Sequence, residues 1–131
     1  MINRIGLVFL GGAVGAAIRE FLVLAGSTIH GHFPTAILGA NLVAAFLIGL
    51  VTALIVKEDA IYEKIQLFVV AGMMGGLSTF STMIWGTVML LREPTEAWIG
   101  WSYLVISLVV GLAMVEIGLR LGTVLRGVRT E

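Results

Sequence analysis

The chain has 131 residues, of which 59% are hydrophobic, and eight Lys or Arg residues balance eight Asp or Glu residues to a formal net charge of zero. Charged residues make up 12%, against roughly 25% in a typical soluble domain, and the mean hydropathy is +1.07, so the surface of a soluble domain would be apolar over too large an area. Basic residues do not outnumber acidic ones, which argues against a nucleic-acid partner. The sequence has no cysteine, which excludes disulfides, thiol catalysis and cysteine zinc sites.

The charged residues leave long uncharged intervals whose lengths match a lipid bilayer. These intervals cover residues 5–18, 21–56, 65–91 and 97–115. The second is too long for one span and contains polar, turn-forming residues near its start. Because a helix needs roughly 20 apolar residues to cross about 30 Å of hydrocarbon, we predict an all-α, multi-pass membrane protein. It forms a single transmembrane domain, residues 1–131, with helices at about 4–26, 34–56, 65–91 and 97–120.

The first predicted helix follows a positively charged N-terminus, as in a signal peptide, but no convincing cleavage site follows it. We therefore expect a retained helix. Arg19 and Glu20 lie near its end, where an arginine typically extends its charged group toward the membrane surface. Glu20 is the one carboxylate on which a small proton-coupled exporter of cationic compounds could depend, although it can pair with Arg19 or reach water.

Small residues in three of the predicted helices are spaced for close helix contacts. Helices in lipid gain little from the hydrophobic effect, so glycines one turn apart allow backbones to approach. Three such pairs occur, at Gly11 and Gly15, Gly72 and Gly76, and Gly118 and Gly122. We expect neighbouring helices to touch at these positions.

The third predicted helix, 65–91, is interrupted in mid-membrane. Residues 72–82 read GMMGGLSTFST, and adjacent glycines followed by hydroxyl residues are poor helix formers. As an unbroken helix the segment would measure about 40 Å, which leaves spare length for a break. Broken membrane helices commonly bind ions, with cations at unwound carbonyls and anions at helix N-termini. The alternative is a glycine kink that serves packing.

Three motifs resemble those of one known family. They are GGAVGAAIR at 11–19, Asn41 in the second apolar span, and GGLSTFST at 75–82. In this order, and over essentially the whole chain, they resemble the CrcB/Fluc fluoride channels. The resemblance implies a four-helix subunit that pairs antiparallel with a second one, with two narrow anion pathways and one central structural sodium ion. It also implies passive export of cytoplasmic fluoride across a bacterial or archaeal plasma membrane, and hence fluoride resistance.

The resemblance assigns roles to the residues of the predicted break. Gly75 and Ser78 match positions whose backbone carbonyls hold the sodium, and a hard cation prefers oxygen ligands. Phe80 matches a pore phenylalanine whose electropositive ring edge faces an anion. Ser81 and Thr82 would offer hydroxyl donors to fluoride.

Two residues outside the break complete the expected fluoride pathway. Asn41 would donate from its amide, with an interhelical hydrogen bond as the alternative. Arg19 matches the family's first-helix arginine and would attract anions into a vestibule. Thr79 and Glu116 are further candidates without an assigned role.

Several positions depart from the family pattern. Met83 stands where the family has a second phenylalanine, and Leu112 and Glu116 stand at hydroxyl positions of the fourth helix. Arg120 follows Glu116 by four residues, the favourable order for an ion pair, so Glu116 belongs either to an interfacial pair or to a vestibule or pore. These departures favour the alternative of a structural partner that conducts weakly or not at all.

The placement of positive charge predicts a single orientation. With four spans, the termini and the 57–64 loop share one side, which carries Arg4, Lys57, Lys64, Arg120, Arg126 and Arg129. The other side carries Arg92, and Arg19 if it is counted there. Both termini should therefore be cytoplasmic. A subunit with dual topology needs a near-even count, so we expect one member of a heterodimer with an oppositely oriented paralogue, and an antiparallel dimer of the chain with itself is the alternative.

Catalysis is not expected. The sequence offers no nucleophile with a nearby base, and His30 and His32 lack a third metal ligand. The exporter alternative has no use for the break in the third helix, so Glu20 is its sole support.

Overall fold

The computed structural model describes residues 2–26, 34–55 and 60–128, which form helices and no strand. The first, second and last passes are α1 (Ile2–Gly26), α2 (Thr35–Leu54) and α6 (Ala97–Val128). The third pass consists of α3 (Ala60–Ile65), the π-helix η1 (Gln66–Met74), α4 (Gly75–Leu77) and α5 (Phe80–Arg92).

The predicted all-α membrane architecture is confirmed. Four helical segments of the described chain are long and apolar enough to cross a bilayer. The third pass starts before the predicted residue 65, and α6 continues past the predicted residue 120. Both extensions carry charged residues, which do not prevent a helix from projecting beyond the hydrocarbon. His30, His32, Lys57 and Arg129 lie outside the described residues.

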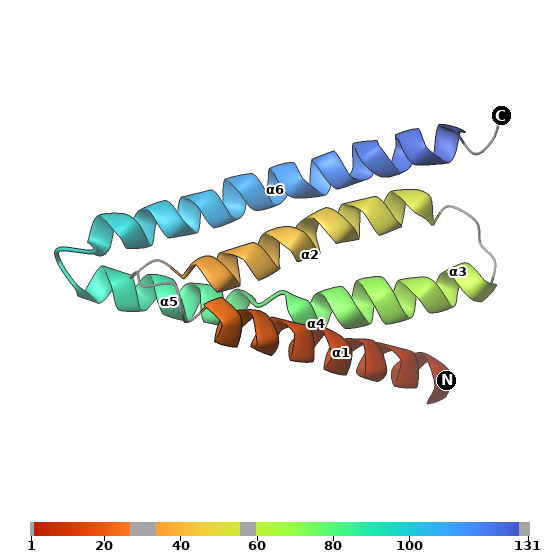
Figure 1. Ribbon diagram of the computed structural model, residues 1–131, viewed down its shortest axis with the longest axis horizontal. Coiled ribbons are helices and arrows are strands. Elements are labelled where there is room, and N and C mark those ends of the chain that lie inside the picture. Colours follow the sequence, from red (N-terminus) through yellow and green to blue (C-terminus); the bar gives the residue numbers. More distant parts are fainter. Residues whose placement is uncertain (1, 27–33, 56–59, 129–131) are drawn as a thin grey trace.

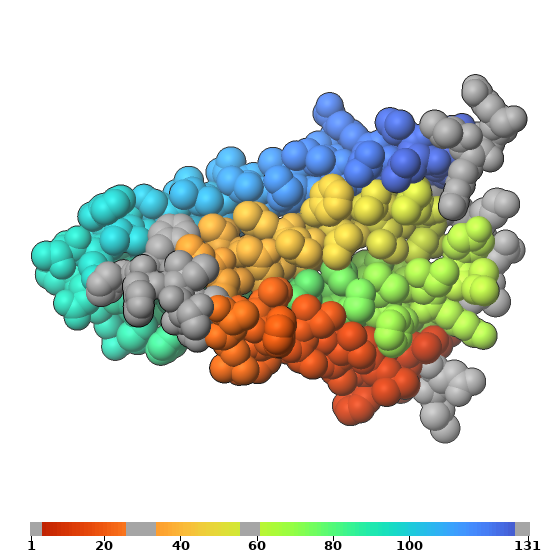
Figure 2. Space-filling view, viewed as in Figure 1, coloured from red at the N-terminus to blue at the C-terminus, as the bar shows by residue number. Residues whose placement is uncertain are grey.

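The four passes alternate in direction, so that α2 and α6 run together and opposite to α1 and the third pass (Figure 1). The start of α1 and the end of α6 lie at the same end of the molecule. In the space-filling view, α6 forms one flank and α1 the other, with α2 between them (Figure 2). The fold therefore places Arg4 and Arg126 at one end and the α5–α6 connection at the opposite end.

The first glycine pair brings the backbone of α1 directly onto the third pass. A Cβ atom at Gly11 would overlap the carbonyl oxygen of Phe68, and one at Gly15 would overlap that of Met73. Only a residue without a side chain allows such contact, because the clashing partner is backbone and cannot rotate away. The predicted contact is confirmed, and we call this the α1 glycine seam.

A second glycine seam joins α2 to α6. A Cβ atom at Gly118 would overlap the carbonyl oxygen of Phe46, and one at Gly49 would overlap that of Val115. The expected contact at Gly118 is therefore present, whereas Gly49 has no glycine partner one turn away and was not predicted. The two seams divide the described chain into two close pairs of passes.

The two pairs meet in a small core of buried side chains. Ala40 and Ala44 of α2 pack against Met74 and Leu77 of the third pass, and all four are at most 3% exposed. The small alanines allow α2 to lie close to the end of η1 and to α4. This packing positions α2 beside the point where the third pass is interrupted.

Candidate functional site

The interruption of the third pass consists of two extended residues. Ser78 (φ −75°, ψ 151°) and Thr79 (φ −147°, ψ 112°) lie between the end of α4 and the start of α5. The Ser78 N–H still donates to the Met74 carbonyl at 2.9 Å, so the chain is helical up to this point. Gly75 and Gly76 belong to α4. The predicted break is therefore confirmed, but it follows the glycines instead of including them.

The side chain of Asn41 bridges α2 to the break. Its Oδ1 accepts from the Thr79 N–H at 2.7 Å, and its Nδ2 donates to the Thr79 carbonyl at 3.2 Å. Thr79 is only 8% exposed, so water cannot easily replace these bonds. The amide thus gives the Thr79 N–H an acceptor in place of the Gly75 carbonyl of a continuous helix, and it adds a donor to the Thr79 carbonyl. The interhelical hydrogen bond is present, and contact of Asn41 with an anion stays a prediction.

Thr79, to which the sequence assigned no role, is the N-cap of α5. Its hydroxyl accepts from the Thr82 N–H at 3.2 Å, as expected of a threonine in that position. The same hydroxyl donates to Thr82 Oγ1 at 2.9 Å and lies 3.3 Å from Ser81 Oγ. The cap therefore holds together the three hydroxyl groups at the start of α5.

These substitutions leave two carbonyls of the break without their helical donors. In a continuous helix the Gly75 carbonyl would accept from the Thr79 N–H, and the Ser78 carbonyl from the Thr82 N–H. The structure directs those two N–H groups to Asn41 and to the Thr79 hydroxyl instead. The carbonyls of Gly75 and Ser78, the predicted sodium ligands, are thereby released from the helix.

Arg19 reaches the break from α1. Its Nη1 donates to the carbonyl of Gly76 at 3.3 Å, and the residue is half-buried. The sequence is compatible with two locations for the Arg19 guanidinium, the membrane surface or an anion vestibule. The structure brings its positive charge beside the interruption, next to the released carbonyl of Gly75.

The predicted pathway residues of α5 divide between two faces of the helix. Phe80 is 71% exposed and Ser81 and Thr82 are also exposed, whereas Met83 is 5% exposed. Met83 packs on the inner face, where the Thr87 hydroxyl donates to its carbonyl at 2.9 Å. The structure brings Phe80, Ser81 and Thr82 together and separates Met83 from them within this protomer.

The outer face of α5 carries an open pocket of about 280 Å³ lined by Ser81, Thr82 and Trp85. Tryptophan is enriched at membrane interfaces, so the sequence alone favours an anchoring role for Trp85. Its spacing of three and four residues from the two hydroxyls could have indicated the shared face. Sequence reasoning therefore missed Trp85 as a lining residue.

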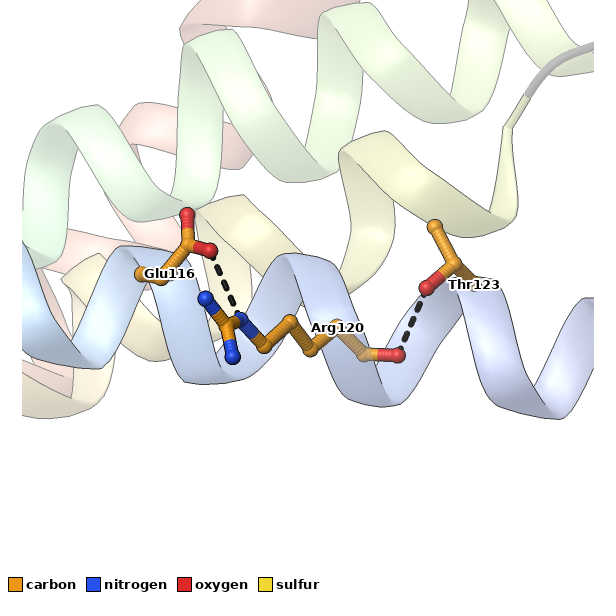
Figure 3. Close-up of polar contacts among 3 residues, drawn as sticks. All are labelled: Glu116, Arg120 and Thr123. Atoms are coloured by element: carbon orange, nitrogen blue, oxygen red, sulfur yellow. Dashed lines mark hydrogen bonds and ion pairs between the residues drawn. The ribbon is translucent and has the colours of Figure 1, made fainter.

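Glu116 and Arg120 form the ion pair that their spacing predicts, with Nε and Oε1 2.7 Å apart (Figure 3). Both side chains are exposed on α6, as is Leu112 one turn earlier. Further along α6, Arg126 donates to the Ala53 carbonyl at the end of α2. Glu116 lies ten residues before Arg126, which is about 15 Å further from that end of the helix. Each charge at that depth is costly in lipid, and pairing lowers the cost.

Comparison with known proteins gives one consistent result. The family model described as CrcB-like protein, Camphor Resistance (CrcB), matches residues 6–119. A relative from Yersinia pseudotuberculosis, named fluoride-specific ion channel FluC 3, is 48% identical over 93% of this chain and 90% of its own length. The FluC of Clostridium perfringens is 33% identical over 91% of this chain and 93% of its own. FluC 2 of Brucella melitensis is 40% identical over 93% of this chain, which spans only 45% of that relative.

Removal of the Asn41 amide should destabilise the protein. In Asn41→Ala the buried N–H of Thr79 loses its acceptor and the Thr79 carbonyl loses one donor, which we expect to lower the free energy of unfolding by about 1–3 kcal/mol. In detergent, the melting temperature followed by tryptophan fluorescence should fall by about 4 °C or more. Ser102→Ala is the control, because the Ser102 hydroxyl only donates to a carbonyl of its own helix. Equal melting of Asn41→Ala and wild type would contradict a structural role for this amide.

Proposed function

The chain belongs to the CrcB-like family, and we propose that it is a subunit of a passive fluoride channel. In this role it would let fluoride leave the cytoplasm of a bacterium or archaeon across the plasma membrane and so provide resistance. The similarity to proteins named as fluoride-specific channels over nearly the whole chain is the observation that carries the proposal. A channel also requires no catalytic group.

The outer face of α5 supports passage of an anion. Phe80 exposes its ring there, and Ser81 and Thr82 expose hydroxyls at the first turn of the helix. Fluoride is small and strongly hydrated, so it crosses hydrocarbon only where donors replace part of its water shell. Hydroxyl groups and the electropositive edge of an aromatic ring provide such replacement.

Arg19 supports the same proposal from the other side of the break. A guanidinium held beside the interruption raises the local potential for anions without closing the pathway by a salt bridge. Its contact with the Gly76 carbonyl also limits how far the side chain can move. Arg19 would thus combine attraction of anions with support of the break.

The released carbonyls fit the structural sodium that the family resemblance implies. Gly75 and Ser78 would supply backbone oxygens, and an antiparallel second subunit would supply two more, a donor set that suits a hard cation. When bound, sodium would neutralise the partial negative charge of these carbonyls at the dimer centre. Asn41 and Thr79 contribute by keeping the competing N–H groups away from them.

A second candidate is a structural partner that completes a channel but conducts little itself. The burial of Met83, which replaces a pore phenylalanine, and the Glu116–Arg120 pair on α6 favour it. The structure gives less support to the proton-coupled exporter. Glu20 lies exposed on α1, and the exposed donors of α5 have no part in proton-coupled export. We therefore keep the conducting subunit as the main proposal.

Fluoride efflux from liposomes tests the conducting role. The chain, reconstituted alone or together with an oppositely oriented paralogue, should release fluoride, and Phe80→Ile should abolish release, because the exposed ring is lost while the core of the subunit is untouched. Phe9→Ile, at a phenylalanine of α1 that is 74% exposed, should behave like wild type. Release that requires a second, paralogous chain and persists in Phe80→Ile would favour the structural partner. Chloride release or proton-coupled cation uptake would contradict a fluoride channel.

Sodium should stabilise the folded protein. A cation that binds only the folded state adds about 2.7 kcal/mol when its concentration is 100-fold above its dissociation constant. We expect a higher melting temperature in sodium chloride than in N-methylglucamine chloride of equal ionic strength, with potassium giving a smaller gain. The same melting temperature in all three salts would remove the case for a sodium site at Gly75 and Ser78.

We also propose that the chain inserts in one orientation, with both termini in the cytoplasm. The end of the molecule that carries the start of α1 and the end of α6 holds Arg4, Lys64 and Arg126, whereas Arg92 lies at the other end. Fluorescent and phosphatase reporters fused to the C-terminus should therefore show a cytoplasmic location only. Signals on both faces of the membrane would indicate dual topology and overturn the fixed orientation.

A further inference from the structure

The pocket on the outer face of α5 contains a donor that the proposed fluoride pathway does not use. Ser81, Thr82 and Trp85 line this pocket of about 280 Å³. They lie one turn apart, so their side chains share one face of the helix. Trp85 is 63% exposed, although its neighbours Met83 and Thr87 are buried.

The hydrogen bonds around the pocket determine which donors remain available. Thr79 has one hydroxyl hydrogen, which it gives to Thr82 Oγ1, so the hydroxyl hydrogen of Thr82 is not used in that contact. The Ser81 hydroxyl lies near the same Thr79 oxygen, at 3.3 Å. Within the described part of the chain, the indole N–H of Trp85 makes no hydrogen bond. The Thr82 hydroxyl and the Trp85 indole N–H are therefore the donors that remain available to a ligand.

We propose that Trp85 is a further anion-contacting residue of this pathway, whose indole N–H donates to fluoride beside the hydroxyls of Ser81 and Thr82. The proposal rests on the proposed function for the identity of the anion. It assigns to Trp85 a part in ion selection in place of an anchoring role at the membrane surface.

The chemistry of the indole explains what tryptophan adds to two hydroxyls. A Ser or Thr hydroxyl is both donor and acceptor, so it can turn its oxygen toward a cation as readily as its hydrogen toward an anion. The indole nitrogen is a donor only. A pocket lined by hydroxyls alone does not select the sign of the ion, and the indole N–H of Trp85 adds a group that can only donate, which suits an anion.

The size of the pocket fits an ion that still carries water. The pocket is open to its surroundings, and its volume of about 280 Å³ is far larger than one bare fluoride needs. Fluoride would therefore enter it with part of its hydration shell. The donors of Thr82 and Trp85 then replace some of that water before the ion moves on.

Indole NMR tests the contact without depending on transport. The chain has three tryptophans, so ¹⁵N-tryptophan labelling gives three indole signals, and Trp85→Phe identifies one by its loss. Addition of sodium fluoride to the protein in detergent should move the Trp85 signal in a saturable manner. Trp98 and Trp101 are similarly exposed on α6 and should stay in place. An unmoved Trp85 signal, equal movement of all three, or the same movement with sodium chloride would overturn the proposal.

Efflux measurements test the consequence for transport. Trp85→Phe keeps an aromatic ring but removes the N–H, and it should slow fluoride release by roughly fivefold, the equivalent of one ordinary hydrogen bond. Trp101→Phe is the matched control and should release fluoride like wild type. Wild-type rates in Trp85→Phe would show that the indole has no part in permeation. If wild type itself releases no fluoride, the proposed function fails, whereas the indole signals still decide whether Trp85 binds the anion.

Discussion

The site depends on how an interrupted backbone is satisfied inside a bilayer, where water cannot supply missing hydrogen bonds. The two extended residues Ser78 and Thr79 would leave several main-chain groups unpaired. Asn41 of α2 pairs both groups of Thr79, Arg19 of α1 pairs the Gly76 carbonyl, and the Thr79 hydroxyl caps α5. The Thr79 hydroxyl is local, but Asn41 and Arg19 come from positions fixed by helix packing, so the break depends on the assembled fold.

The fold was largely predictable from the sequence because its strongest constraint is simple. Bilayer thickness sets the length of the uncharged intervals, and those intervals gave four passes and a break in the third. Two details of the third pass could not be predicted from the sequence. Gly75 and Gly76 stay helical, and Gly76 instead allows close approach to Gly12 of α1. The π-helix η1 has no local sequence signature, since its wider turn depends on its neighbours.

The sequence grouped residues around the break but could not give the orientation of their side chains. The motif at 75–82 placed Phe80, Ser81 and Thr82 together correctly, because they are adjacent in sequence. Which face of α5 turns outward could not be deduced, since the two extended residues reset the rotation of the helix that follows them. For this reason the sequence grouped Met83 with the pathway and left out Trp85, whereas the structure buries the first and exposes the second.

The two glycine seams bear on how the protein responds to lipids of different thickness. Where backbone lies against backbone, as at Gly15 and Met73 or at Gly118 and Phe46, no flexible side chain is available to absorb a displacement. We therefore expect a thicker or thinner bilayer to be accommodated by tilting whole pairs of passes. The contact of Arg19 with the Gly76 carbonyl lies within one such pair and should survive a change of tilt, whereas the contact of Asn41 with Thr79 joins the two pairs and would bear the displacement.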